Sequence, residues 1–404
     1  MAGDHLYVWD DGRRAGVFTE SATGRIEFAY DKDATRPLSL SLPLEGGWKP
    51  EAPYRFLDGL LPDDEGERIR MRVALGASGM GLFGLLDRVD VVGGLVFSTM
   101  DEPLVAAPSP LRPAASEDIA ARIVRLQQER SAWWERDGRT RFSLAGTQGK
   151  FTLSWFQDRW FWPNVSMPST HIVKPPARAV ADADIVEHLS MNLAAACGLD
   201  VPEHALLQVG EARAYMVGRF DRVLHGDAPA TRLRIEDLTQ AMGLPKEEKY
   251  YVEIGEVIVF LRMFDPSDEL GYAWLSQVMF NVLIGNCDAH AKNYSLYLDG
   301  DAPRLCPLYD CLVTRYWPDF DRELAMQVND VPHAEDVTEA DWAAEAAADG
   351  LDAGRVVDRV RELSKAMRDA APTVLTAEEW SRPVGKRLLA CLEQTCLPRR
   401  GCRG

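Results

Sequence analysis

The chain is expected to fold as an α+β protein in which two β-rich parts precede a helical part. Short apolar runs separated by turn signals occupy residues 5–45 and begin again near residue 142. From about residue 235 the apolar residues recur at spacings of three and four, which is typical of buried helices. Four prolines within residues 101–115 indicate a linker between the two β-rich parts.

This order divides the 404 residues into three expected domains, in keeping with the usual size of a domain. Residues 1–105 are expected to form a small β-rich N-terminal subdomain, residues 106–225 a β-rich lobe and residues 226–396 an all-helical lobe. The last two would make a two-lobed arrangement with a cleft. Residues 397–404 are expected to form a tail.

Turn signals predict the strands of the first two domains. Asp11-Gly12 lies between apolar runs and predicts a hairpin. Leu38, Leu40 and Leu42 alternate with other residues, which predicts a strand with one apolar face. In the second domain, Gln157-Asp158 predicts another hairpin.

Helices are expected from about residue 117 to 135 and from about residue 182 to 197, the second ending at Gly198. In the last domain, Thr338 with Asp341 and Thr376 with Glu379 have the spacing of capping boxes, which predicts two helix starts. A buried helix is expected where five apolar residues share one face, namely Leu275, Val278, Met279, Val282 and Leu283.

Composition limits the partners and the compartment. Lys and Arg total 45 against 62 Asp and Glu, a net charge of −17, which makes a poor stand-alone binder of nucleic acid because phosphate contacts need a basic surface. Seven cysteines without C-x-x-C spacing suggest neither a disulfide framework nor a zinc site, which fits a reducing compartment. The sequence shows no apolar leader and no run of 18 apolar residues, so a cytoplasmic protein without membrane contact is expected.

The densest polar cluster is GNCDAHAKNYS, residues 285–295, which follows directly on an apolar run. In it, Asp288 and Asn293 have the spacing D-x-x-x-x-N. Phosphoryl transfer needs a carboxylate that accepts or orients the hydroxyl of the nucleophile, and a neutral oxygen ligand nearby for a magnesium ion. For this pair taken alone, an ordinary solvated loop is the alternative.

Asp310 follows in LCPLYDCLV, after a hairpin that Asp299-Gly300 predicts. An ionised carboxylate among apolar neighbours costs free energy unless something pairs with it. A metal ion is a suitable partner, as at the second magnesium-binding aspartate of kinases. A turn or a helix N-cap is the alternative.

Three stretches of the β-rich lobe have features of a phosphate or nucleotide site. SLAGTQGK, residues 143–150, is a loop of small residues whose glycines would let backbone N–H groups approach phosphates, with charge added by Lys150; a plain turn is the alternative. Lys174 ends the run THIVK and suits the phosphate lysine of a kinase, paired with Glu187, although most such lysines are solvated. In MVGRFDR, Asp221 suits a ribose hydroxyl, unless this strand end is simply polar surface.

Six stretches, in this order, resemble the HipA family of toxin kinases from bacterial toxin–antitoxin modules: RFSLAGTQGK, PSTHIVKP, VGRFDR, RIEDLTQAMGLPKEEKY, FNVLIGNCDAHAKNYSLYL and PLYDCLVT. SLSLPL and FLDGLLPDDEGERIR resemble the small N-terminal subdomain of the family. The resemblance covers residues 5–395. It implies a two-lobed protein-kinase-like fold that carries this β-rich subdomain.

The resemblance also implies roles for single residues. Asp288 would be the catalytic base, and Asn293 and Asp310 would bind Mg2+. Ser143 matches the position of autophosphorylation, whose modification ejects the loop and silences the enzyme. The residues that would bind ATP are Ala145, Gly146, Thr147, Gln148, Gly149, Lys150, Lys174, Arg219, Phe220, Asp221, His290, Ala291, Lys292, Asn293, Tyr309 and Asp310.

The activity that the resemblance implies is that of a serine/threonine-protein kinase toxin dependent on ATP and magnesium. Family members phosphorylate an aminoacyl-tRNA synthetase, glutamyl-tRNA synthetase in the best-known case, which arrests growth and produces persistence. A HipB-type helix-turn-helix antitoxin would neutralise the toxin and carry it to operator DNA.

Two other functions are compatible with the same motifs. One is a kinase-like phosphotransferase that acts on a small molecule, which the N-terminal subdomain argues against. The other is a catalytically silent co-repressor, which the intact Asp288, Asn293 and Asp310 argue against.

Overall fold

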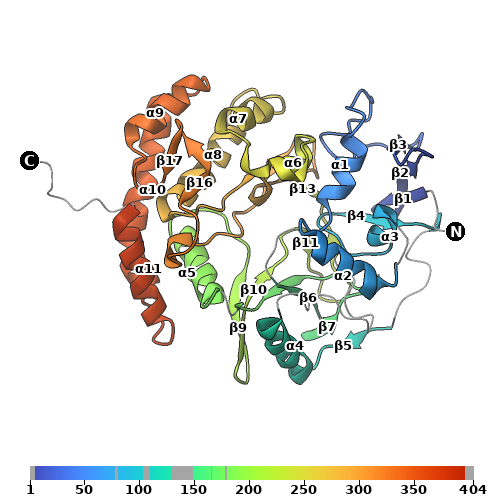
Figure 1. The fold of residues 1–404 in the computed structure, drawn as a ribbon, viewed down its shortest axis with the longest axis horizontal. Coiled ribbons are helices and arrows are strands. Elements are labelled where there is room, and N and C mark those ends of the chain that lie inside the picture. The colour runs from blue at the N-terminus through green and yellow to red at the C-terminus, as the bar shows by residue number, and fades with distance from the viewer. Residues whose placement is uncertain are drawn as a thin grey trace, which may run out of the picture. The chain divides into compact units, whose positions relative to one another are not determined.

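The computed structural model describes residues 5–77, 81–102, 110–129, 149–164, 166–177 and 180–395 (Figure 1). Ser143, residues 145–148 of the expected phosphate loop and the expected tail lie outside these ranges. The chain divides into two compact units. The first is made of residues 1–179, 207–247 and 297–300, and the second of residues 180–206, 248–296 and 301–404.

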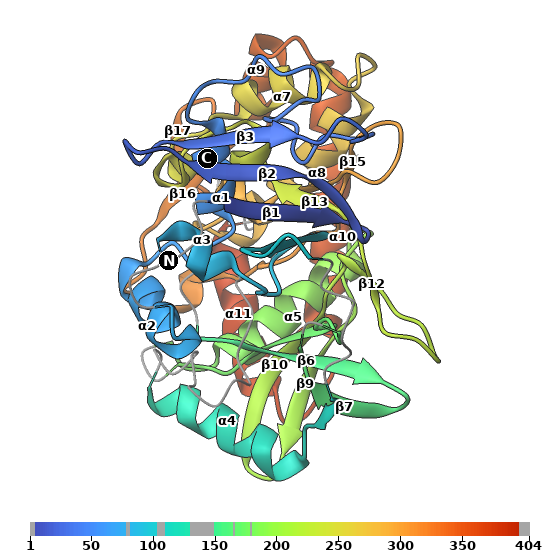
Figure 2. The same ribbon diagram turned by 90° about the vertical axis from the view of Figure 1, so that its right-hand side faces the viewer.

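The first unit begins with a four-stranded antiparallel sheet in the order β3-β2-β1-β4. Figure 2 shows its first three strands side by side. The predicted first hairpin is confirmed, because Asp11 (φ 48°) and Gly12 (φ 75°) form its turn in the left-handed region. The elements up to the linker are β1 (His5–Asp10), β2 (Arg13–Glu20), β3 (Ile26–Tyr30), α1 (Ala52–Gly59), α2 (Glu65–Leu75), α3 (Leu82–Leu86) and β4 (Leu95–Ser98).

The strand predicted from the alternating leucines at positions 38 to 42 is wrong, because the chain turns here. The N–H of Leu42 donates to Ser39 O at 3.0 Å, and the N–H of Ser41 donates to Ser39 Oγ at 3.0 Å. The N–H of Leu40 donates to Glu236 Oε1 at 2.9 Å. Serine hydroxyls that bond to the neighbouring backbone compete with strand pairing, and alternation alone does not reveal this.

A second sheet of the first unit has six strands in the order β5-β7-β6-β8-β10-β9, and α4 packs against β10. The predicted second hairpin is confirmed, with Gln157 (φ 48°) and Asp158 (φ 58°) at its turn. The elements are β5 (Arg112–Pro113), α4 (Ser116–Gln128), β6 (Phe151–Phe156), β7 (Arg159–Trp162), β8 (His171–Lys174), β9 (His204–Val209), β10 (Ala212–Gly218), β11 (Arg222–Val223), β12 (Thr231–Arg232), β13 (Ile235–Asp237), α6 (Leu238–Ala241) and the 3-10 helix η2 (Lys246–Tyr250). Of these, β9 begins and η2 ends with residues of the second unit.

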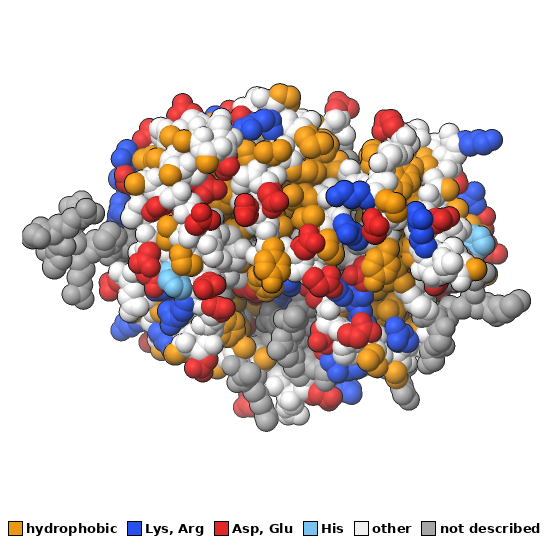
Figure 3. All heavy atoms as spheres, turned by 45° about the horizontal axis from the view of Figure 1, so that its top comes forward, with side chains coloured by type: hydrophobic (Ala, Val, Ile, Leu, Met, Phe, Trp, Pro, Cys, Tyr) orange, Lys and Arg blue, Asp and Glu red, His pale blue; other side chains and the backbone are white. Residues whose placement is uncertain are grey.

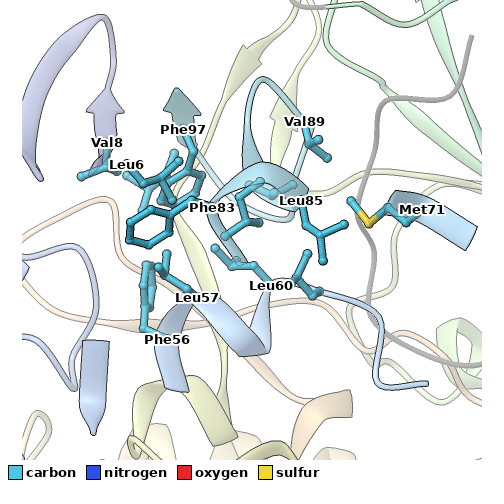
Figure 4. Close-up of a cluster of buried hydrophobic side chains, with 14 of the residues drawn as sticks. Leu6, Val8, Phe56, Leu57, Leu60, Met71, Phe83, Leu85, Val89 and Phe97 are labelled. Atoms are coloured by element: carbon cyan, nitrogen blue, oxygen red, sulfur yellow. The ribbon is translucent and has the colours of Figure 1, made fainter. Parts of the chain in front are cut away.

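One continuous core lies under both sheets of the first unit. Its cluster of buried side chains runs from Leu6 in β1 to Ala214 in β10. The ring of Phe18 meets that of Phe28 at a tilt of 34° with centroids 4.4 Å apart, and it stacks on Phe56 of α1 with centroids 6.1 Å apart. Figure 4 shows the part of this cluster contributed by β1, α1, α2, α3 and β4. The N-terminal subdomain and the β-rich lobe therefore share apolar burial, the main stabilising contribution in folding.

Helices make up most of the second unit. The predicted α5 is confirmed, ending before Gly198 (φ 81°), and so is the predicted α8. The capping box of Thr338 and Asp341 starts α9, as expected. The helices are α5 (Ala183–Ala196), α7 (Ile254–Arg262), α8 (Glu269–Ile284), α9 (Glu339–Ala348), α10 (Ala353–Val374) and α11 (Arg382–Thr395), with 3-10 helices η3 (Ala291–Asn293) and η4 (Thr314–Tyr316).

Two expectations for the helical part need correction. The box of Thr376 and Glu379 starts no helix, because Thr376 Oγ1 donates back to Pro372 O at 2.6 Å and α11 begins at Arg382. The lobe is not all-helical, because a hairpin turns at Asn329-Asp330, both at positive φ. The strands of this part are β14 (Ser295–Tyr297), β15 (Arg304–Leu305), β16 (Glu323–Val328) and β17 (Val331–His333).

Charged side chains of both signs are interspersed over the described part of the face in Figure 3. In the part of the chain that the structure describes, no helix is long and apolar enough to cross a membrane. The boundaries of the three expected domains stay a prediction.

Candidate active site

The loop that carries Asp288 and Asn293 begins where α8 ends in the second unit. Gly285 caps the helix in the left-handed region (φ 69°, ψ 40°), a conformation that glycine adopts without steric cost. A Cβ on this glycine would lie 2.9 Å from Arg315 Cδ, so the close packing also favours glycine. The polar loop thus begins at the well-packed C-terminal end of the buried helix α8.

Side chains of neighbouring elements hold this loop. Asn286 Nδ2 donates to Asn281 Oδ1 of α8 at 2.9 Å. The N–H of Cys287 donates to Thr314 Oγ1 at 3.0 Å, and the same hydroxyl donates to Gly285 O at 2.9 Å. Because buried hydrogen bonds such as these fix the backbone on both sides, the loop presents Asp288 in one conformation.

Asp288 and Asn293 lie together, as the D-x-x-x-x-N spacing requires. Asn293 Nδ2 donates to the backbone O of Asp288 at 3.0 Å. The N–H of Asn293 donates to His290 O at 2.8 Å, which closes the turn that includes η3. Because the amide nitrogen of Asn293 is engaged, its Oδ1 is the atom suited to a metal ion.

Asp288 is exposed as a whole residue, but the atoms packed around its carboxylate raise the pKa of that group. Burial by neighbouring atoms is the main cause, and the negative charge of Asp310 adds to it. A hydrogen bond from Tyr250 and the positive charge of Lys249 act in the opposite direction. Tyr250 Oη donates to Asp288 Oδ1 at 2.7 Å.

Asp310 lies in the segment that follows β15 and has a left-handed backbone (φ 53°). Tyr309 Oη donates to Lys292 O at 2.8 Å and lies 2.7 Å from Ser295 Oγ, so this segment is attached to the loop of Asp288. The negative charge of Asp310 also contributes to the raised pKa of the Cys311 thiol, after burial and Glu187. Its charge therefore acts on residues of both segments.

The donor set of this site suits magnesium. The carboxylate of Asp310 and the amide oxygen of Asn293 are hard oxygen ligands of the kind that Mg2+ binds, and Asp288 adds a second negative charge that acts together with Asp310. Among the described residues, no three side chains of His, Cys, Asp or Glu gather into a metal site. The predicted pair of ligands, Asn293 and Asp310, is different in kind, because one of the two is an amide, and it stays a prediction.

Three residues predicted at the nucleotide, His290, Ala291 and Lys292, lie in or next to η3 and are almost completely buried. The ring of Tyr250 meets the imidazole of His290 edge-on, with centroids 4.8 Å apart and planes at 84°. Tyr250 was missed by the sequence analysis, although it lies within the quoted stretch RIEDLTQAMGLPKEEKY. Its partner is 38 residues away, and no spacing rule connects the two.

The other predicted nucleotide residues lie in the first unit. Lys174 ends β8, and its Nζ lies 5.9 Å from the centroid of the Tyr215 ring on the paired strand β10. Gly149 and Lys150 precede β6, and Lys150 is 7% exposed. Phe220 accepts a hydrogen bond from Tyr297 Oη at its backbone O, 3.0 Å away. Their roles at ATP stay predictions.

Arg219 and Asp221 belong to a buried network of ion pairs. Arg219 Nη2 lies 2.6 Å and Arg222 Nη1 2.8 Å from Asp221 Oδ2, which also accepts from the N–H of Gly93 at 2.8 Å. Arg219 Nη1 and Arg222 Nη2 lie 3.3 Å and 3.0 Å from the two carboxylate oxygens of Asp90. The predicted contacts of Arg219 and Asp221 with adenine or ribose stay predictions, and these side chains would have to give up bonds to make them.

In this network the positive charges of the arginines neutralise the negative charges of Asp90 and Asp221. Burial alone would raise the pKa of Asp90, but Arg222, Arg219 and Arg232 hold it well below its usual range. The pKa of Asp221 is lowered in the same way. Burial and the like charge of Arg219 lower the pKa of Arg222 to about 10, so it remains a cation at neutral pH.

Comparison with known proteins gives the family. A family model described as HipA-like C-terminal domain matches residues 142–372, and one described as HipA N-terminal domain matches residues 6–97. Y4mE of Sinorhizobium fredii (strain NBRC 101917 / NGR234), a protein assigned to the kinases, is 34% identical over 387 residues, 92% of this chain and 91% of that protein. The serine/threonine-protein kinase toxin HipA of Shewanella oneidensis is 29% identical over 326 residues, 74% of this chain and 73% of that protein.

A solved structure agrees with these matches. It contains HipA of Shewanella oneidensis MR-1 with HipB and operator DNA, and it superposes with a TM-score of 0.82, 25% identity and 96% coverage of each chain. The expected kinase-like α+β fold is thereby confirmed. Since one family model covers more than half of the sequence and a relative is 34% identical over 92% of it, this chain belongs to the HipA family.

Proposed function

We propose that this chain is an ATP- and Mg2+-dependent serine/threonine-protein kinase and the toxin of a HipBA-type toxin–antitoxin system. The observation that carries the proposal is the meeting of Asp288 and Asn293 in one loop, with the charge of Asp310 acting on Asp288. A kinase needs these three groups in one place.

Each residue has a part in this chemistry. Asp288 accepts the proton of the acceptor hydroxyl or orients that hydroxyl toward the γ-phosphate. Asn293 and Asp310 hold magnesium, which neutralises charge on the phosphates when bound. Tyr309 keeps the segment of Asp310 attached to the loop through its bond to Lys292 O.

The proposed ATP-binding residues extend beyond these three. Lys174 would bind phosphate, and residues 145–150 would form the phosphate loop. Ser143 would be the site of autophosphorylation. The remaining residues proposed at the nucleotide are Arg219, Phe220, Asp221, His290, Ala291, Lys292 and Tyr309.

The partners follow from the relatives. The solved HipA of Shewanella oneidensis is in complex with HipB and operator DNA, and this chain matches 96% of it. We therefore assign a HipB-type antitoxin to this chain, with contact to operator DNA through that antitoxin. The net charge of −17 favours a basic partner of this kind. The proposed target is an aminoacyl-tRNA synthetase such as glutamyl-tRNA synthetase, in the cytoplasm, with growth arrest and persistence as the result.

The test is transfer of labelled γ-phosphate from ATP by the purified chain with Mg2+, to Ser143 and to purified glutamyl-tRNA synthetase. Asp288→Asn is expected to reduce the rate by about 10²–10⁴-fold, the usual contribution of a general base. Asp358→Asn, an exposed position on α10, is the matched control and should keep the wild-type rate. If the chain does not consume ATP, or if Asp288→Asn transfers phosphate as fast as the wild type, the kinase proposal is wrong.

The labelling assay and a growth assay in cells that express the chain separate the alternatives. Label on a small molecule instead of protein would identify a phosphotransferase of another class. Toxicity that Asp288→Asn retains in full would identify a catalytically silent partner of the antitoxin.

A further inference from the structure

Tyr250 is held against the catalytic loop by contacts with the loop itself. Its Oη donates to Asp288 Oδ1 at 2.7 Å, and its ring packs edge-on against His290. Lys249 Nζ lies 5.1 Å from the centroid of the same ring. The phenol therefore stands at the carboxylate that the proposed reaction uses.

The bond that Tyr250 makes is of the kind that a substrate would make. A serine or threonine hydroxyl approaching the catalytic base must donate its hydrogen to a carboxylate oxygen of Asp288. The hydroxyl of Tyr250 already donates to Oδ1 at an ordinary distance for such a bond. A second hydroxyl cannot take the same position until the first leaves.

We propose that Tyr250 is a gate on Asp288, whose phenolic hydroxyl occupies the place of the acceptor hydroxyl until the substrate displaces it. This inference rests on the proposed kinase function. Tyr250 is thus a residue that regulates access of the acceptor, and the nucleophile of the reaction is the hydroxyl that replaces it.

The surroundings of Tyr250 allow it to open. It is the last residue of η2, a 3-10 helix of five residues without any buried member. Its side chain is 47% exposed, and the next residue, Tyr251, is 79% exposed. Segments with few buried contacts open at low free-energy cost. Opening breaks the hydrogen bond to Asp288 and the edge-on contact with His290.

If Tyr250 is such a gate, removing its hydroxyl oxygen should speed the hydrolysis of ATP. Tyr250→Phe and its control, Tyr251→Phe, are measured in a Ser143→Ala background, which removes the proposed internal acceptor, with Mg2+ and ATP but without protein substrate. Water is then the acceptor: its oxygen attacks the γ-phosphate, its proton passes to Asp288, and ADP leaves with the bonding electrons. Tyr250→Phe keeps the ring against His290 but frees Asp288 Oδ1 for water. We expect the kcat of ATP hydrolysis to rise by about 10-fold or more, the factor that corresponds to one hydrogen bond to a charged group, with an unchanged KM for ATP.

Tyr251→Phe is the matched control, since it removes a hydroxyl from the neighbouring exposed ring, and it should keep the wild-type kcat. An unchanged or lower kcat in Tyr250→Phe would overturn the gate, because a residue that only positions Asp288 or supports the fold cannot slow turnover by its presence. Phosphate found on Tyr250 by mass spectrometry would overturn it too, since Tyr250 would then be an acceptor.

Asp288→Asn, measured in parallel, separates this inference from the proposed function. If Asp288→Asn loses ATP hydrolysis and Tyr250→Phe equals the wild type, the gate is wrong while the kinase stands. If the wild type does not hydrolyse ATP at all, both fail.

Discussion

Two groups of aspartates in this protein are surrounded in opposite ways. In the first unit, Asp90 is ion-paired with Arg219, Arg222 and Arg232, and its pKa lies well below the usual range. In the second unit, Asp288 has a second carboxylate, Asp310, close enough to raise its pKa. The chain itself supplies the positive charges that neutralise the first group. The second group has an excess of negative charge, which favours binding of a cation from solution.

The difference indicates what each group contributes. A buried charge that keeps all its partners is tolerated, but removing one partner leaves the others uncompensated at a high cost in stability. A pair of carboxylates that repel each other costs stability as it stands, and such strain is typical of functional sites. The arginine network therefore holds Asp90 to the segment that follows β10, while the site of Asp288 has the electrostatics that are typical of a functional site.

The largest expected effect is on the network. Asp90→Asn should lower the free energy of unfolding by about 3–5 kcal/mol, because it leaves the buried guanidinium groups of Arg219 and Arg222 with Asp221 as their one remaining carboxylate in the network and so with excess positive charge. Asp288→Asn should change it by less than about 0.5 kcal/mol or raise it, because a repulsion is removed. Urea denaturation followed by tryptophan fluorescence measures both. Equal losses in the two variants would remove the distinction between the two groups.

Glu236 is intermediate between the two groups, because it is buried and has polar partners but its pKa is still raised. The dependence of stability on pH therefore tests the comparison. Burial raises its pKa to about 7 from 4.5, against hydrogen bonds from Ser39 and Leu40 and the charge of Arg234. The folded protein thus binds this proton more tightly than the unfolded chain does. Its contribution to stability is fully present below pH 4.5 and is lost as the pH rises to about 7, a loss of about 3 kcal/mol at 1.36 kcal/mol per pKa unit.

Glu236→Gln tests this directly, because glutamine stays neutral at every pH. Denaturation midpoints measured between pH 5 and pH 8 should fall less steeply for the variant than for the wild type. Above pH 7 the variant should be the more stable of the two. Parallel curves would show that the buried carboxyl does not titrate in this window.

Within the network, the smaller loss of stability is expected at a neutral member. Ser169 Oγ donates to Asp90 Oδ2 at 2.6 Å and accepts from Arg219 Nη1 at 2.8 Å. Ser169→Ala should cost about 1.5 kcal/mol of unfolding free energy, the usual value for a hydrogen bond to a charged group. The double variant with Asp90→Asn should lose less than the sum of both, because the two residues share partners. Strict additivity of the two losses would argue against one network.

The fold was predictable where local chemistry decides it. The left-handed turn at Asp11-Gly12, the end of α5 before Gly198 and the capping box of Thr338 follow from rules that involve only neighbouring residues. The loop of Asp288 and Asn293 was predictable for the same reason. Rules of this kind failed at Ser39, whose hydroxyl turns the chain, and at Thr376, which bonds back to α10.

Contacts between distant residues were not predictable from spacing. Asp90 meets Arg222 across 132 positions, and Tyr250 meets Asp288 across 38. Each of these residues taken alone has the pattern of a solvated surface side chain. Only the folded chain shows that Asp90 is neutralised by arginines and that Asp288 accepts a hydrogen bond from the phenol of Tyr250.

The most direct test of the contrast between the two groups is the shift in melting temperature on adding Mg2+ with a non-hydrolysable ATP analogue. The wild type should gain up to about 2.7 kcal/mol of stability at a ligand concentration 100 times its Kd. Asp90→Asn, although it melts earlier, should show the same increment, whereas Asp310→Asn should lose most of it. A full increment in Asp310→Asn would contradict the assignment of these carboxylates to a metal–nucleotide site.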